Sequence, residues 1–544
     1  MLIDSPRQPA TSGHQPKLAS HRPSAQCRCS TVRPRRDNRA GRPAASGRAC
    51  RGDPITSPWN RAGTIVLFRC RAVATFDPIA TLQDFRSRFP WSHEHFGGRD
   101  SIVETTFDAV VIGGGPAGAV CAASLAKQNR SVLVLDRQAF PRFHIGESML
   151  PYMVGLLERL GLLDAVRKQG YVVKRGGEFI DPTGTKFFGS GVFRADFTKQ
   201  GASRHHETFQ VERSHFDTVM LEQATAAGAE ILTQAQVTEL LMTGDRITGV
   251  RYQRNGQEHT AHARYVVDAS GRAGKIANRF VLRKMIEQLR MVAVFRHYEG
   301  LDERHNPGFE GDIQVGSHPD GWVWAIPLSR DKISVGTVMP RTVLRTSEPA
   351  RAFEEHAARI PRIVQRLTGT RPCTEFQVET DYCYHTDQVT GPGWLMAGDA
   401  GCFGDPMFSG GVLVAMVTGA RAASTIARAV DDPGSETDGM TEYANFFKTG
   451  YDTYVRLIFS FYESELVSAL ADASTHTFRG NLEMYMVRLL GGDFWSAHNP
   501  IAAALRANRA WDTFAPFEPV FGCPVYPELD ELDRAEMASA GRGA

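Results

Sequence analysis

One segment near residue 110 restricts the fold of this chain more than any other. A short apolar run at 107–112 leads directly into the glycine-rich sequence GGGPAG at 113–118. A run of mostly small residues follows at 119–128, and a second apolar run at 131–135 ends in Asp136. Apolar runs of this length are typical of strands buried on both faces of a parallel sheet. The order strand, glycine turn, helix, strand and acid predicts a nucleotide-binding α/β unit.

Each glycine of the fingerprint, and the acid after it, has its own expected role. Gly113 allows the tight turn, Gly115 lets backbone N–H groups approach a pyrophosphate, and Gly118 lets the helix pack on the strand. The start of the helix adds partial positive charge for the phosphates. Asp136 is expected to accept hydrogen bonds from a ribose diol. A glycine turn without a ligand is the alternative, but it leaves the strand, helix and acid together unexplained.

Two later runs indicate that the nucleotide is a flavin. Residues 266–272 form a buried run that contains Asp268 and ends in a polar glycine turn, and residues 394–400 form another that contains Asp399. Ligands bind beyond the carboxyl ends of strands in such sheets, so Asp399 is expected to accept from a ribityl hydroxyl. A long helix with Ala and Gly on its packing face is expected at 412–430.

These blocks, with the sequence QVER at 210–213 and Asp217 after it, resemble the FAD-dependent oxidoreductases of the aromatic-hydroxylase fold. The resemblance runs from Phe107 to Val430 and implies an α/β fold. Its expected parts are an FAD-binding Rossmann-like domain at 105–430, a β-sheet substrate domain inserted at about 170–210 and 285–385, and a helical C-terminal region at 431–544. In that last region, aromatic residues spaced by three and four between Tyr443 and Phe461 are expected to pack onto the substrate domain, and residues 496–544 are expected along the surface.

Two further motifs narrow the resemblance. The sequence WVWAIP at 322–327 fits the W-x-W-x-I-P signature of flavin-dependent halogenases, and FGDPMFSGG at 403–411 fits their F-x-x-P-x-x-S-x-G signature. Two tryptophans that alternate on a strand are also ordinary sheet packing. Both motifs in this order, after the flavin fingerprint, resemble the halogenases that act on phenols, on pyrroles or on carrier-tethered substrates.

The resemblance also implies a reaction. Reduced FAD, O₂ and halide give hypohalous acid, and the halide lies at backbone N–H groups of Ser409, Gly410 and Gly411, where a glycine turn starts a helix. Trp322 and Trp324 are expected to keep the organic substrate away from the flavin, because direct contact gives hydroxylation.

The resemblance also implies a lysine that holds or relays the hypohalous acid. It follows a G-E-S-x-x-P element, found here at 146–151, and a helix expected at 152–169. Lys174 then stands in an apolar segment that begins a strand. A solvated strand lysine is the alternative, and Lys168 and Arg175 are rival cations. A mostly buried lysine has a lowered pKa and a nucleophilic amine.

Further positions are expected to contact FAD. With the turn and its acid included, the full set of expected FAD-binding residues is Gly113, Gly115, Ala117, Gly118, Asp136, Arg137, Ser148, Arg213, Val237, Asp268, Asp399, Pro406 and Val412. Asp405 lies where a covalent link to the flavin is conceivable. The pairs His93/His95 and His205/His206 lack carboxylate or Cys partners at ligand spacing, so no metal site is expected.

The first 104 residues differ in kind from the rest. They are rich in Arg, Pro, Ser and Gly and lack apolar periodicity, which predicts a disordered extension. A start codon assigned too far upstream, a transit peptide and an Arg-rich nucleic-acid arm are the three interpretations, in that order. We expect that deleting residues 1–100 leaves FAD binding and stability unchanged.

Charge and cysteine content exclude several function classes. Residues 1–100 carry 17 basic and 7 acidic side chains, whereas the remaining residues carry 45 and 53, so the body of the chain gives no reason to expect nucleic-acid binding. No window approaches 18 consecutive apolar residues, so no membrane span is expected. Nine scattered cysteines without a C-x-x-C pair favour a reducing cytoplasm.

The chain contains one dinucleotide fingerprint, so a separate NAD(P)H-dependent flavin reductase is an expected partner. The tryptophan-type halogenases look less similar to this chain than the phenol, pyrrole and carrier-tethered types. The sequence leaves the acceptor and the choice of chloride or bromide open. An FAD-dependent aromatic hydroxylase, an isoprenoid-type reductase and a non-catalytic FAD-binding protein are the competing functions.

Overall fold

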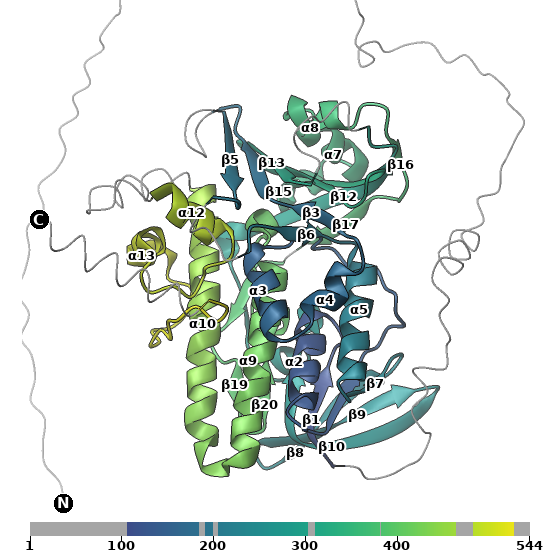
Figure 1. The fold of residues 1–544 in the computed structure, drawn as a ribbon, viewed down its shortest axis with the longest axis vertical. Coiled ribbons are helices and arrows are strands. Elements are labelled where there is room, and N and C mark those ends of the chain that lie inside the picture. Colours follow the sequence, from purple (N-terminus) through teal and green to yellow (C-terminus); the bar gives the residue numbers. More distant parts are fainter. Residues whose placement is uncertain are drawn as a thin grey trace, which may run out of the picture. The chain divides into compact units, whose positions relative to one another are not determined.

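The computed structural model describes residues 106–183, 191–199, 205–302, 311–380, 382–463 and 482–526. The expected N-terminal extension, residues 1–104, lies outside these residues. Figure 1 shows the described elements: two sheets, a layer of helices beside the first sheet, and a helical C-terminal part. This is the α/β fold class that the sequence predicted.

The first sheet forms around the glycine-turn segment. Its path runs β19-β20-β10-β1-β2-β7, and the hairpin β8–β9 extends the long strand β10. The strands are β1 (Thr106–Ile112), β2 (Val132–Leu135), β7 (Glu230–Leu232), β8 (Gln236–Thr243), β9 (Arg246–Arg254), β10 (Gln257–Asp268), β19 (Thr390–Gly391) and β20 (Trp394–Met396). The central strands β20, β10, β1, β2 and β7 are parallel. Their apolar runs are buried on both faces, as a parallel sheet covered by helices requires.

The register of these strands positions the site. Ile112 pairs with Asp268 and with Leu135, and Asp268 pairs with Met396, so four strands end at one edge of the sheet. The turns that leave this edge carry Gly113, Asp136, Ser270 and Asp399. A crevice at the carboxyl edge of such a sheet is the usual ligand position.

Three helices pack beside this sheet: α2 (Pro116–Ala126), α5 (Arg213–Ala226) and α9 (Gly411–Asp431). A Cβ atom on Gly419 of α9 would lie 2.3 Å from the carbonyl oxygen of Ala117, so this glycine allows α9 and α2 to approach closely. By length and composition α9 is the one described helix that could cross a membrane, and 78% of its apolar window is buried in the core.

The second sheet has the order β16-β12-β15-β14-β13-β4-β5, with β17 also paired to β12. Its strands are β4 (Gly176–Ile180), β5 (Val192–Asp196), β12 (Met291–Glu299), β13 (Ile313–His318), β14 (Gly321–Pro327), β15 (Lys332–Pro340), β16 (Arg371–Pro372) and β17 (Gln377–Thr380). Successive residues of β14 point to opposite faces of this sheet. Val323 and Ala325 pack with α7 (Pro349–Ala357) and α8 (Pro361–Arg366), whereas Trp322 and Trp324 belong to the main core.

Short elements connect the two sheets. The helices α3 (Pro151–Arg159) and α4 (Leu163–Arg167) replace the single helix expected at 152–169, because Gly161 adopts a left-handed conformation with φ of 65° between them. Two strand pairs and one short helix complete this part: β3 (Val172–Lys174) with β6 (Thr208–Gln210), β11 (Arg283–Met285) with β18 (Tyr384–Thr386), and α6 (Lys275–Arg279).

The C-terminal part contains α10 (Glu436–Tyr462), α12 (Leu482–Leu490) and α13 (Pro500–Ala507), and Figure 1 shows α10 alongside α9. The aromatic stripe of α10 is buried, but the expectation that it packs onto the substrate domain was wrong for most of its length. Tyr443 donates to the carbonyl oxygen of Met396 in β20, and only the end of α10 reaches Trp322. The expected surface course after residue 496 was also wrong for the described part, because Tyr526 is 2% exposed and packs edge-on against Tyr152.

Candidate functional site

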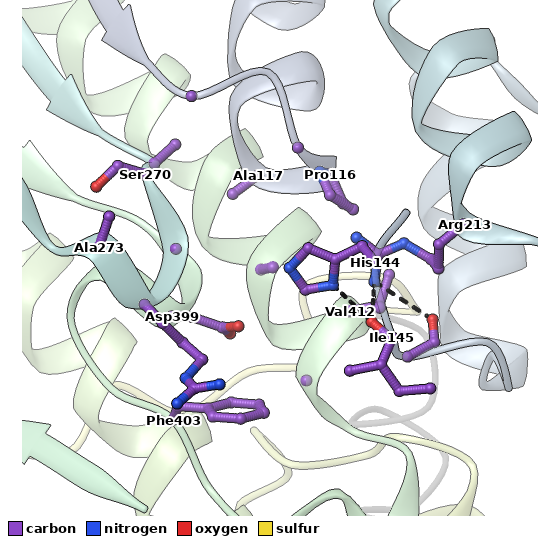
Figure 2. A pocket seen from close by; sticks show the side chains of 18 of the residues that line it. Pro116, Ala117, His144, Ile145, Arg213, Ser270, Ala273, Asp399, Phe403 and Val412 are labelled. Carbon is purple, nitrogen blue, oxygen red and sulfur yellow. Dashed lines mark hydrogen bonds between the residues drawn. The ribbon is translucent and has the colours of Figure 1, made fainter. Parts of the chain in front are cut away.

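A cavity of about 470 Å³ opens at the carboxyl edge of the first sheet. Its wall combines the glycine turn, the loop 142–148, the start of α5, the turns after β10 and β20, and one face of the second sheet. Figure 2 shows Pro116 and Ala117 on one side of this cavity, Asp399 and Phe403 on another, and His144 beside Arg213 and Ile145. The cavity therefore draws on both sheets.

The glycine turn has the geometry that its sequence predicted. Gly113 has φ of 103°, and its N–H donates to the carbonyl oxygen of Leu135 over 2.8 Å. The Asp136 carboxylate, 6% exposed, accepts from the N–H of Gly114 over 2.8 Å and thereby ties the turn to the end of β2. Gly115 is the N-cap residue of α2 and makes no side-chain cap, so the first amides of the helix face the cavity unblocked by a cap.

The loop 142–148 is fixed by an ion pair at the start of α5. Arg213 and Asp217 form two hydrogen bonds of 2.8 and 3.0 Å, and both side chains are buried. The remaining Arg213 nitrogen donates to the carbonyl oxygen of Ile145 over 2.8 Å. Arg142 lies 3.3 Å from the same Asp217 carboxylate. The guanidinium of Arg213 thus holds this side of the cavity in place.

Two titratable groups face the cavity with shifted pKa values. Desolvation by the surrounding loop, together with the nearby charge of Arg213, lowers the pKa of His144 to about 4, so the imidazole is neutral at pH 7 although part of the residue remains exposed. Its Nδ1 donates to the carbonyl oxygen of Ile145 over 2.7 Å. Burial raises the pKa of Asp399 to about 6, against the opposing charges of Arg213, Arg272 and Arg283.

Most of the expected FAD-binding residues line this one cavity. They are Gly113, Gly115, Ala117, Asp136, Arg137, Ser148, Arg213, Val237, Asp399, Pro406 and Val412. Gly118 lies behind them, where a Cβ atom would be 1.9 Å from the carbonyl oxygen of Gly113. Asp268 is not in the cavity wall: its carboxylate accepts from Ser270 and from the N–H of Ile276. The expectation of a direct Asp268 contact is therefore corrected to support of the turn after β10.

The cavity fits a dinucleotide by the chemistry of its wall. Backbone amides at a helix start suit a pyrophosphate, and carboxylates at the ends of β2 and β20 suit sugar hydroxyls. Gly115 has open space, since a Cβ atom there would meet only Arg142, at 3.3 Å. Apolar side chains of the second sheet, among them Phe295, Trp322 and Trp324, cover the end of the cavity away from the turn.

Trp322 contacts the second motif at a buried carboxylate, whereas the indole of Trp324 donates to Ser334 Oγ. The indole N–H of Trp322 donates to Asp405 and to the hydroxyl of Tyr462, each over 3.1 Å. Tyr462 donates to the other Asp405 oxygen over 3.0 Å, and Met407 N–H caps the first. Burial raises the pKa of Asp405 to about 7. The conceivable covalent link to flavin is not supported, because Asp405 is fully buried outside the cavity wall.

The serine turn follows directly from this carboxylate. Ser409 adopts a left-handed conformation with φ of 58°, Gly410 is the N-cap residue of α9, and Gly411 begins the helix. The N–H of Gly410 donates to the hydroxyl of Tyr454 over 3.3 Å, and Tyr454 donates to the carbonyl oxygen of Asp405. Ser409 and Gly411 line the cavity, whereas Gly410 lies behind it.

Lys174 lies in a second, much smaller cavity of about 20 Å³. Its side chain is 2% exposed, and its Nζ donates to Ser148 Oγ over 2.8 Å and to the carbonyl oxygen of Met149 over 2.9 Å. Burial lowers the pKa of Lys174 to about 7, although the charge of Asp312 raises it. The rival cations Lys168 and Arg175 are exposed at the surface. Ser409 and Ile313 line both cavities and so form the wall between them.

Sequence reasoning missed several residues of the wall. Glu147 lines the large cavity and accepts from His297 of β12 over 2.8 Å, with both side chains buried. His144, Arg142 and Arg272 also line it. The GES element at 146–148 gave a signal for Glu147, but its partner is 150 residues away in sequence. No local sequence pattern predicts the contact between Glu147 and His297.

Fold and cavity together define an FAD-dependent oxidoreductase. A family model described as "FAD binding domain" matches residues 106–438. A 1H-pyrrole-2-carbonyl-[peptidyl-carrier protein] brominase of Pseudoalteromonas luteoviolacea is 33% identical over 337 residues, covering 60% of this chain and 78% of that protein. A tryptophan 2-halogenase of Chondromyces crocatus is 29% identical, covering 65% and 67%. The comparison thus gives no support to the expectation that tryptophan-type enzymes are less similar.

Solved structures agree with the curated relatives. The flavin-dependent brominase Bmp2 matches with a TM-score of 0.66 at 29% identity, over 74% of this chain and 98% of that one. The myxobacterial chondrochloren halogenase CndH matches with a TM-score of 0.62 at 27% identity, over 73% and 99%. The chain belongs to the flavin-dependent halogenases, enzymes that use FAD in its reduced form to halogenate aromatic substrates.

Proposed function

We propose that this halogenase acts on an electron-rich phenol or pyrrole, free or tethered to a carrier protein, through hypohalous acid delivered to Lys174. The observation that carries the proposal is the shared wall: Ser409 and Ile313 separate the cavity that fits FAD from the cavity that holds Lys174. Hypohalous acid would be the species that passes between the two cavities, since an aromatic ring is too large for a cavity of about 20 Å³. Two relatives named as pyrrole-2-carbonyl carrier-protein brominase and chlorinase support the acceptor class.

The residues that would hold FAD are those of the large cavity. Gly113, Gly115 and Ala117 would present backbone to the pyrophosphate, while Asp136 and Asp399 would accept from sugar and ribityl hydroxyls. When bound, reduced FAD would supply two electrons that reduce O₂ to the level of peroxide, and this would be the oxidant for the halide. The halide would lie at the Ser409-Gly410-Gly411 turn, where α9 begins. The N–H groups of Ser409 and Gly410 already donate to the Pro406 carbonyl oxygen and to the Tyr454 hydroxyl, so the N–H of Gly411 would be the donor left for the halide.

Lys174 would receive the hypohalous acid as a neutral amine. With a pKa near 7, a substantial fraction of its side chain is unprotonated at neutral pH. The amine nitrogen would attack the halogen, the bond between oxygen and halogen would break, and the departing hydroxide would take the amine proton to give water. The alternative is a protonated Lys174 that orients hypohalous acid by charge and hydrogen bonding.

The tryptophans support halogenation over hydroxylation. Trp322 and Trp324 lie on the face of β14 that covers the cavity, with ring centres 5.6 Å apart. The hydrogen bonds of Trp322 to Asp405 and Tyr462 fix its indole across the end of the cavity. An acceptor ring is thereby kept from the flavin position.

The proposed partners are a separate NAD(P)H-dependent flavin reductase, a halide ion and the acceptor or its carrier. Within the described residues, the turn after β1 is the one that carries the G-x-G-x-x-G fingerprint, and FAD would occupy it. We place the protein in the cytoplasm, where such a reductase and NADH are available.

The experiment supplies the protein with a flavin reductase, NADH, FAD and bromide, and follows phenol and pyrrole acceptors by mass spectrometry. Lys174→Ala is expected to lower halogenated product by about 100-fold or more, with FAD affinity unchanged. Lys174→Arg is expected to stay inactive, because a guanidinium keeps its proton. Lys168→Ala, at an exposed lysine six residues away, is the matched control and should keep full activity.

The outcomes separate the alternatives. Activity in Lys174→Arg would indicate the charge mechanism in place of a haloamine. Wild-type product from Lys174→Ala would overturn the assignment of the lysine. A hydroxylated product formed without halide would favour the hydroxylase, and rapid NAD(P)H oxidation by the protein alone would remove the need for a reductase.

A further inference from the structure

The small cavity around Lys174 contains two side chains that hypohalous acid can oxidise. Of the twelve residues that line it, Lys174 has an amine, Met407 a thioether and Ser409 a hydroxyl, and the others have hydrocarbon side chains or none. Amines and thioethers are readily oxidised by hypohalous acid, and methionine gives the sulfoxide. An otherwise inert wall therefore presents one competitor to the lysine.

Met407 lies on the proposed route itself. Its neighbour Pro406 lines the large cavity, Ser409 lines both cavities, and Met407 lines the small one. The short helix Pro406–Phe408 holds it there, because the Met407 N–H donates to the Asp405 carboxylate over 3.1 Å. The side chain is 1% exposed, so an oxidant from bulk solvent has little access to it.

We propose that Met407 is a site of self-oxidation, at which hypohalous acid that is not consumed by acceptor inactivates the enzyme. The proposal rests on the proposed function, since it requires the oxidant to pass into the Lys174 cavity. The thioether sulfur loses two electrons, the halogen is reduced to halide, and the oxygen is transferred to sulfur. One proton is released with the halide, so the sulfide and hypohalous acid become sulfoxide, halide and a proton.

The consequence follows from size and polarity. A cavity of about 20 Å³ has room for little more than one water molecule. A sulfoxide oxygen placed in it removes that room and adds a strong hydrogen-bond acceptor beside the Lys174 amine. Halogen transfer to Lys174 should then stop, although FAD remains bound in the other cavity.

The test follows wild-type enzyme through turnover with reductase, NADH, FAD, bromide and catalase, first without acceptor. Peptide mass spectrometry then measures sulfoxide at each methionine. We expect Met407 to be oxidised in step with the loss of activity, at least fivefold more than the buried Met416 or the partly exposed Met285. Omitting bromide should abolish this oxidation, and adding acceptor should reduce it severalfold.

Two variants sharpen the test. Lys174→Ala removes the competing amine, so Met407 should be oxidised faster in it. Met407→Leu keeps the side-chain volume but lacks sulfur, and its activity should decay more slowly relative to its own initial rate. Both effects are changes in rate that a purely structural role of Met407 does not produce.

The results that would contradict this inference can be distinguished from those that would contradict the proposed function. Halogenated product together with unmodified Met407 in an inactivated enzyme would overturn this inference alone. Equal oxidation of Met407 and Met285 would indicate oxidant released to solution, and oxidation without bromide would indicate peroxide; either also overturns it. The absence of both halogenated product and bromide-dependent oxidation would instead count against the proposed function.

Discussion

Two glycines of the turn after β1 serve different physical purposes. A Cβ atom on Gly115 would meet only the flexible end of Arg142, at 3.3 Å, and the φ of −72° suits any residue. A Cβ atom on Gly118 would lie 1.9 Å from the carbonyl oxygen of Gly113. Gly115 therefore keeps space for a ligand, whereas Gly118 keeps space for the backbone of the protein itself.

This difference predicts opposite behaviour of two variants. Gly115→Val should fold with an unchanged melting temperature of the apoprotein but lose FAD affinity by about 100-fold or more, because its side chain enters the pyrophosphate position. Gly118→Ala should destabilise the apoprotein by about 2 kcal/mol through overpacking. Thermal unfolding and FAD titration measure the two effects. Tight FAD binding by Gly115→Val would show that the pyrophosphate lies elsewhere.

Asp405 makes the stability of the protein depend on pH. Its pKa rises from 3.8 to about 7 on folding, because burial disfavours the carboxylate. Between pH 3.8 and pH 7, the Asp405 carboxyl group is ionised in the unfolded chain and protonated in the folded protein. The stability that this group contributes is therefore fully present below pH 3.8 and is lost as the pH rises through 7.

Asp405→Asn should remove this dependence on pH. The amide can still accept from Trp322 and can donate to the hydroxyl of Tyr462, so the variant should fold. From pH 5 to pH 8, the free energy of unfolding of the wild type should fall relative to the variant by about 2 kcal/mol. Denaturant titrations at the two pH values measure the difference, and parallel curves would contradict it.

At the scale of elements, α5 and α10 carry similar buried ion pairs with different surroundings. Arg213 and Asp217 on α5 hold the loop that carries Ile145, at the cavity. Arg456 and Asp452 on α10 bind the segment around Asn508, away from it. Both pairs are spaced by four residues, but Arg456 has a second carboxylate partner, Asp512, at 2.6 Å.

Asp217→Ala should destabilise the protein by about 3 kcal/mol, because it removes the carboxylate that pairs with the buried guanidinium of Arg213. Asp452→Ala should cost less, because Arg456 keeps its ion pair with Asp512. Only Asp217→Ala should also weaken FAD binding, by about tenfold or more, since the loop loses its anchor. Denaturation and FAD titration of both variants test this. Equal losses of FAD affinity would indicate a general effect of instability.

At the scale of the whole molecule, the cavity joins both sheets and α9, so FAD is expected to stabilise them together. Free FAD at 100 times its dissociation constant should raise the free energy of unfolding by about 2.7 kcal/mol. Calorimetry should show one transition that moves upward as FAD is added. Gly115→Val should show no such shift, and a second transition that ignores FAD would mean that the sheets unfold separately.

The sequence predicted those parts of the molecule that depend on residues close together in the chain. The turn with Gly113 and Asp136 needs one strand, one helix and the next strand, and it was found in full. The contact between Glu147 and His297 could not be foreseen, because it depends on how β12 docks beside the loop before α3. The position of Asp268 was misjudged for a related reason: the end of a strand can serve its own turn instead of a ligand.

The contact between Trp322 and Asp405 has a consequence for engineering. The two halogenase motifs are about eighty residues apart in sequence, yet one hydrogen bond joins them, with Tyr462 of α10 as a third partner. A chimaera that imports either motif alone from a relative breaks a matched set, and its defects will not add as independent changes do. Exchange between relatives should therefore move the β14 segment, the serine turn and the end of α10 as one block.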